Sequence, residues 1–129
     1  MGRPQTIYVD SNALLAGIAR ATREVLADID AELAELNARE AVKHDFQTGQ
    51  TIYALERYRR TIKSDGVLYD LSAFAGRRLS PSERIRYQQA LRAMAATGLV
   101  ELLGKKARRV KITPAGLAAI DAKLCEVPT

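Results

Sequence analysis

A stripe of apolar residues, repeated every three or four positions, runs through the first third of the chain. Between residues 11 and 39 its members are Leu15, Ile18, Ala21, Val25, Ile29, Leu33 and Leu36. This spacing places them on one face of an α-helix, with charged residues on the opposite face. The helix would have roughly 25 residues, more than twice the average of about 11 in globular proteins. We therefore predict a long N-terminal amphipathic helix, with Asp10 or Ser11 as its N-cap.

The apolar face of this long helix has two alternative uses. It either pairs with a second copy of the chain or packs against the C-terminal helices of the same chain. The residues that would form the dimer surface under the first alternative are Leu15, Ile18, Val25, Ile29, Leu33 and Leu36. We accordingly divide the chain into residues 1–46, an N-terminal arm and long helix that could mediate dimerisation, and residues 47–129, a second unit described below.

Length and composition restrict the protein to one ordinary class. The 129 residues suit a single domain, and 47% apolar with 27% charged residues is typical of a soluble globular protein. Aromatic residues make up only 5%, there is no Trp, and Ala and Leu recur throughout, which predicts a mainly α protein. Apolar runs are far shorter than the roughly 20 residues that cross a bilayer, and the first residues lack a secretory apolar core. We expect a cytoplasmic protein without membrane contact.

Few residues are candidates for catalysis or metal binding. The sequence has one Cys and one His, no metal-ligand spacing and no phosphate-cradling glycine loop. The acidic residues of the long helix and the scattered tyrosines lie at positions typical of a solvated face or of a core. We therefore expect no enzyme, no metal and no cofactor.

Two shorter helices follow the long one in our interpretation. A polar loop over 44–50 precedes helical spacing over 51–63 and again over 68–75, with glycines at the end of each. The sharpest boundary comes next, at Ser80-Pro81-Ser82-Glu83. It combines a hydroxyl cap, a proline at the first helical position and a glutamate that can reach back to the cap.

The last 50 residues alternate between helix and strand signals. The helix that begins at Pro81 ends before Gly98, and residues 99–103 and 110–112 then have strand character. Between these strands lies a basic loop, so the pair predicts a β-hairpin. Thr113-Pro114 repeats the signal of a cap followed by proline and starts a final helix of roughly ten residues.

Charge is distributed unevenly along the chain. Residues 1–70 contain 9 Lys and Arg against 11 Asp and Glu, a net charge of −2, whereas residues 71–129 contain 11 against 4, a net charge of +7. Clustered cations attract polyanions such as nucleic acid. The alternative, a solvated basic face without a partner, stays open.

The order of elements and three sequence fragments resemble a known group of proteins. The fragments are Tyr87–Met94, Thr97–Glu101 and Arg108–Gly116. Over about residues 51–125 the chain is similar to bacterial winged helix-turn-helix regulators, including those of the multiple-antibiotic-resistance type. The resemblance implies a mainly α, winged helix-turn-helix fold with a two-stranded β wing, and it makes residues 47–129 the DNA-binding domain. The charged connection from Gly76 to Ser80 is longer than the tight turn usual in such a motif.

Helix geometry predicts which side chains would meet DNA. With Tyr87 and Leu91 turned inward, the helix over 81–97 turns another set outward, where it can read base edges in the major groove. This set is Ser82, Ile85, Arg86, Gln89 and Arg92. Other cations are placed to contact the phosphate backbone, the last four of them in the wing over 104–110, on the backbone or the minor groove. They are Arg77, Arg78, Arg84, Lys105, Lys106, Arg108 and Arg109.

Two functions follow from this interpretation. The first is a sequence-specific transcriptional regulator that binds double-stranded DNA as a homodimer. The alternative is a winged helix that serves as a protein-interaction or assembly module, for instance in a mobile-element or replication complex. A weaker third option is an architectural protein that binds nucleic acid without sequence preference.

Overall fold

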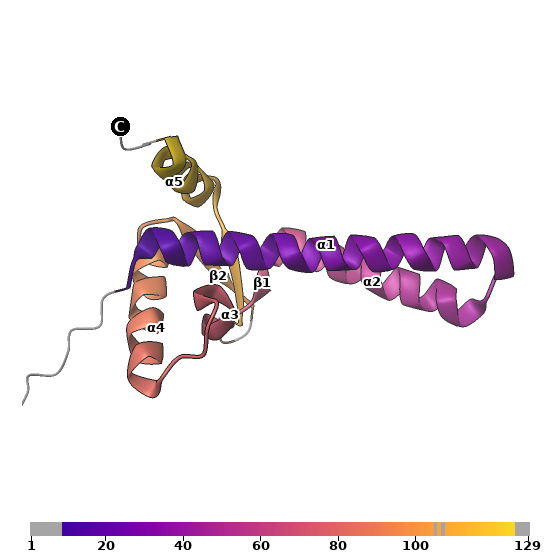
Figure 1. Ribbon diagram of the computed structural model, residues 1–129, viewed down its shortest axis with the longest axis horizontal. Coiled ribbons are helices and arrows are strands. Elements are labelled where there is room, and N and C mark those ends of the chain that lie inside the picture. The colour runs from indigo at the N-terminus through magenta and orange to yellow at the C-terminus, as the bar shows by residue number, and fades with distance from the viewer. Residues whose placement is uncertain (1–8, 105, 107, 126–129) are drawn as a thin grey trace, which may run out of the picture.

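Helix α1, Ser11–Lys43, runs along the whole length of the molecule (Figure 1). The computed structural model describes residues 9–104, 106 and 108–125. Within this part, 75% of the residues are helical, in five helices accompanied by a small three-stranded antiparallel sheet. The predictions of a mainly α fold and of a long N-terminal helix are confirmed. Asp10 is its N-cap, since its carboxylate accepts a hydrogen bond from the Asn12 N–H at 3.0 Å.

Helix α2, Phe46–Asp65, returns antiparallel to α1 and forms a helical hairpin with it (Figure 1). The predicted loop over 44–50 is wrong, because only His44 and Asp45 separate the two helices. His44 takes a left-handed conformation with φ 49°, and Asp45 caps α2 by accepting a hydrogen bond from the Gln47 N–H at 3.1 Å. Residues 30–58, which form the free end of this hairpin, are called the arm below.

A short strand, β1 (Val67–Leu68), follows α2 and was not predicted. It pairs with β3 and makes the sheet three-stranded, so the expected two-stranded sheet is incomplete. Gly66, with φ 89°, precedes it, and a Cβ there would lie 2.0 Å from the Val110 carbonyl oxygen, so only glycine lets the strands approach. The helix expected over 68–75 is correspondingly shorter, because α3 spans only Leu71–Ala75 and begins after the capping residue Asp70.

The remaining elements agree with the predicted order. Helix α4 spans Pro81–Ala96, and strands β2 (Val100–Leu103) and β3 (Arg109–Ile112) form the expected hairpin. The strand order in the antiparallel sheet is β1-β3-β2. Helix α5, Pro114–Cys125, begins at the expected proline, and the Gly116 N–H donates to the Thr113 hydroxyl at 3.1 Å. Thr113 is thus the predicted cap.

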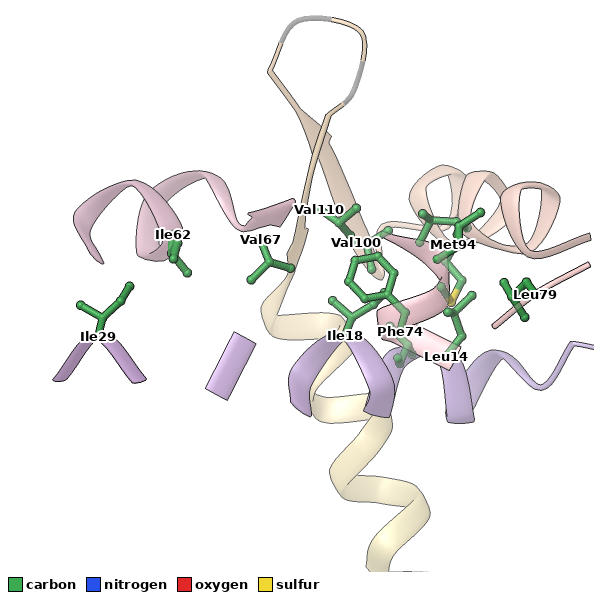
Figure 2. Packing of buried hydrophobic residues seen from close by; sticks show 13 residues of the cluster. Leu14, Ile18, Ile29, Ile62, Val67, Phe74, Leu79, Met94, Val100 and Val110 are labelled. Carbon is green, nitrogen blue, oxygen red and sulfur yellow. The ribbon is translucent and has the colours of Figure 1, made fainter. Parts of the chain in front are cut away.

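One hydrophobic core joins the N-terminal half of α1 to the sheet and the shorter helices (Figure 2). Figure 2 shows Leu14, Ile18, Phe74, Met94 and Val100 converging from four elements. The same cluster continues between α1 and α2, through buried residues that include Ile29 and Ile62. Helices α4 and α5 lie on opposite sides of α1 (Figure 1). The first half of α1 is therefore part of the body, and the arm extends away from it.

Candidate nucleic-acid interface

The start of α4 is fixed by a reciprocal capping arrangement. The Glu83 N–H donates to the Ser80 hydroxyl at 3.2 Å, and the Ser80 N–H donates to the Glu83 carboxylate at 3.0 Å. The Arg77 guanidinium also donates to this carboxylate. Hydrogen bonding from Arg77, followed by that from the Ser80 backbone, lowers the pKa of Glu83 to about 2. Arg77, predicted as a phosphate contact, is thus already paired within the protein.

Among the described residues, no other element covers the outward face of α4. All five residues predicted to read bases are exposed: Ser82, Ile85, Arg86, Gln89 and Arg92. Ile85, a large apolar side chain, is 56% exposed. On the opposite face, Leu91 and Met94 are buried in the core and Tyr87 is half-buried, as the helical spacing predicts. The predicted division of α4 into an inner and an outer face is confirmed.

The predicted cations differ in how they are held. Arg78, Arg84, Lys106 and Arg108 are exposed, whereas Lys105 lies outside the described residues. Arg109 is half-buried; it donates to the Gly66 carbonyl oxygen at 3.0 Å, and its guanidinium carbon lies 6.0 Å from the centre of the Tyr58 ring. Arg109 therefore ties the loop end of the β2–β3 hairpin to α2, which the sequence did not indicate.

A groove separates α4 from the β2–β3 hairpin. Its volume is about 490 Å³. The lining residues come from α4, from the segment around β1 and from the hairpin: Leu68, Tyr69, Gln88, Arg92, Leu102, Lys106 and Arg108. All the charged lining residues are cations. Burial raises the pKa of the Tyr69 hydroxyl, and the positive charge of Arg92 opposes that shift.

Four lining residues of this groove, Leu68, Tyr69, Gln88 and Leu102, were not predicted as site residues. Gln88 lies on the flank of α4 rather than at the centre of its outer face, and its place on that flank could have suggested it. Leu68 is 56% exposed at the end of β1. Its exposure could not be foreseen because β1 itself was missed.

The residues of the proposed dimer surface are used largely inside the chain. Leu15 and Ile18 are completely buried in the core beside α3 and the sheet, and Ile29 is 5% exposed. Val25, Leu33 and Leu36 are half-buried. Leu15 and Ile18 are therefore not available to a second copy, and their packing corresponds to the intramolecular alternative that the sequence left open. The half-buried residues lie farther along α1.

Comparisons with protein-family models, curated proteins and solved structures found no match. Within residues 9–104, 106 and 108–125, no three His, Cys, Asp or Glu side chains are grouped in a way that could hold a metal ion. No helix in this part of the chain combines the length and the apolar character needed to cross a membrane.

Proposed function

We propose that this chain is a winged helix-turn-helix protein that binds double-stranded DNA with sequence preference. The observation that carries the proposal is the groove between α4 and the β2–β3 hairpin, which borders an exposed reading face and has only cations as its charged lining. Helix α4 would enter the major groove, and the hairpin loop would contact the backbone or the minor groove. The element order from β1 to β3 and the strand order β1-β3-β2 support this assignment.

The groove itself has a place in this arrangement. A major groove and the adjacent minor groove are separated by one sugar-phosphate strand. If α4 lies in the first and the hairpin loop in the second, that strand passes through the groove between them. Arg92, Lys106 and Arg108 then face phosphates, and the Gln88 amide and the Tyr69 hydroxyl can donate hydrogen bonds to phosphate oxygens. Arg109, which is tied to α2, would position the hairpin rather than bind DNA.

DNA selected from a random pool, titrated over a range of salt concentrations, tests the proposal. Several phosphate contacts require that the logarithm of the affinity falls linearly with the logarithm of the salt concentration. The double variant Arg86→Ala, Gln89→Ala should lose preference among sequences, whereas Arg108→Ala should weaken binding to all sequences and reduce the salt slope by about 1. Arg39→Ala, an exposed arginine on the arm, is the matched control and should change neither property. Binding without salt dependence, or none at low salt, contradicts the proposal.

Dimerisation is a separate part of this proposal. Because Leu15 and Ile18 are internal, a homodimer formed through the apolar stripe of α1 would use the arm, where Leu33 and Leu36 are only half-buried. Such a dimer would bind two half-sites about one helical turn apart. Sedimentation equilibrium of the purified chain measures the oligomeric state. The symmetry of the selected DNA shows whether two half-sites are bound.

The end of the arm favours a second candidate function, that of a protein-interaction module. Val42, Phe46 and Tyr53 are 80%, 77% and 62% exposed there. Phe46 and Tyr53 line one hollow, and Val42 lines a second hollow that shares Asp45 with the first. Exposed apolar side chains in such hollows are typical of docking sites. This function predicts that Phe46→Ala and Tyr53→Ala abolish assembly with a partner protein, whereas Arg86→Ala has no effect. The DNA proposal predicts that Arg86→Ala impairs DNA binding and that Phe46→Ala and Tyr53→Ala leave DNA binding unchanged.

A further inference from the structure

A second groove, lined by α1, α2, β3 and α5, contains none of the candidate DNA-contacting residues. We call it the α1–α5 groove, and its volume is about 300 Å³. Ligand pockets in proteins start at about this size, which suits a single acyl chain or a small ring system rather than a nucleotide. Its lining includes Ala19, Leu26, Ile62, Ile112 and Leu117.

The floor of the α1–α5 groove is apolar. Ile62 is buried, Leu26 and Ile112 are half-buried, and Leu117 is 51% exposed at the edge. The one hydroxyl in the lining belongs to Thr22, and it already donates to the Ile18 carbonyl oxygen at 2.8 Å. The lining side chains of the floor therefore favour hydrocarbon and leave polar recognition to the charged residues around it.

All the charged residues that line this groove are cations. Arg23, Lys63 and Lys111 come from three different elements, α1, α2 and β3, and no carboxylate of the described residues lines the groove with them. Within the described part of the chain none of the three has a carboxylate within ion-pair distance, whereas Arg59, also on α2, is paired with Asp30 at 2.7 Å. Like charges around a low-dielectric surface repel one another, and an anion between them relieves this repulsion.

We propose that the α1–α5 groove binds a small amphipathic anion, namely an aliphatic carboxylate. Its hydrocarbon chain lies on Leu26, Ile62 and Leu117, and its carboxylate lies among Arg23, Lys63 and Lys111. Burial of the hydrocarbon tail supplies the affinity, because the removal of apolar surface from water is favourable. The cations select the sign of the head group. This binding does not depend on the DNA-binding function.

Dodecanoate, titrated below its micelle concentration and followed by proton–nitrogen correlation NMR, tests the proposal on the intact chain. We expect saturable binding at one site, with the largest shifts at the amides of Gly66, Lys111, Ile112 and Leu117. Dodecyltrimethylammonium has the same tail and the opposite charge, and it should bind at least about tenfold more weakly. Equal binding of the two compounds, or shifts scattered over the molecule, overturns the proposal.

Variants distinguish this groove from general surface charge. Lys63→Glu should weaken dodecanoate binding by at least about fivefold. Arg60→Glu makes the same change of charge on an exposed residue of α2 outside the groove, and it should leave binding unaltered. Equal effects of these two variants contradict the proposal.

A filling substitution addresses the shape of the groove. Ala19→Phe places a ring where the hydrocarbon chain would lie and should abolish dodecanoate binding, with an unchanged circular dichroism spectrum as the control for folding. If this variant does not fold, the comparison of Lys63→Glu with Arg60→Glu still decides. If dodecanoate does not bind and sedimentation shows a dimer that Ala19→Phe dissociates, a second copy of the chain covers the groove and the proposal is wrong.

Discussion

Gly17 provides a sharp test of the packing between α1 and α3. It is a buried residue in the interior of α1, and a Cβ at this position would lie 1.9 Å from the carbonyl oxygen of Phe74, where ordinary van der Waals contact begins at 3.4 Å. The obstacle is backbone, and the Phe74 side chain is itself buried in the core. An alanine at position 17 therefore has to push α3 away from α1 and displace Phe74.

Helix propensity and packing predict opposite signs for Gly17→Ala. Alanine in a helix interior is favoured over glycine by about 1 kcal/mol. Overpacking of a close contact costs about 3 kcal/mol when the obstacle is backbone that must move with part of the core. We expect Gly17→Ala to lower the free energy of unfolding by about 2 kcal/mol, which moves the urea midpoint down by about 1 M for an m-value of about 2 kcal/mol/M.

Gly49 on α2 is the matched control for this substitution. A Cβ at Gly49 would meet only the end of the flexible Glu40 side chain, at 3.3 Å. Gly49→Ala should therefore raise the free energy of unfolding by about 0.5–1 kcal/mol. Urea denaturation of both variants at neutral pH measures the difference. If Gly17→Ala is as stable as the original chain or more stable, the close approach of α1 and α3 is wrong.

Three further predictions concern α4 and the cap of α5. The folded-state pKa of Glu83 is lowered from 4.5 to about 2, so its stabilising effect should be fully present above pH 4.5 and be lost as the pH falls towards 2. The difference in unfolding free energy between the original chain and Glu83→Gln should follow this course, and a constant difference would contradict it. Thr113→Val should destabilise the protein by about 1–3 kcal/mol in urea denaturation, since the hydroxyl lies 2.6 Å from the Gly98 carbonyl oxygen and accepts the Gly116 N–H. Ile85→Ala should change stability by less than about 0.5 kcal/mol while it weakens binding to the selected DNA; a larger loss of stability would mean that Ile85 packs in the core.

Strong local signals made the C-terminal half of the fold predictable. Ser80-Pro81-Ser82-Glu83 determines the start of α4 by hydrogen bonds within four residues, and Thr113 does the same for α5. Such contacts depend little on the rest of the chain, so the sequence alone reveals them. The inner and outer faces of α4 follow from the same local geometry.

The parts that the sequence did not reveal depend on contacts between distant residues. Strand β1 has two residues, too few for an alternating pattern, and it exists because β3 pairs with it. Arg109 resembles the other loop cations in sequence, yet its bond to the Gly66 carbonyl oxygen requires the folded sheet. The stripe of α1 likewise gives no indication of where its partner changes from the body to α2, which is why Leu15 and Leu36 received the same interpretation.

The continuity of α1 has a mechanical consequence. Its 33 residues correspond to about 50 Å of uninterrupted helix, whose first turns are embedded in the body beside α4 and whose last turns form the tip. The helix has no break between these two ends. A partner bound at Val42 and Phe46 would therefore be held at a fixed distance and angle from a partner bound at α4. If both proposed surfaces are used, the helix is a rigid spacer between the two partners.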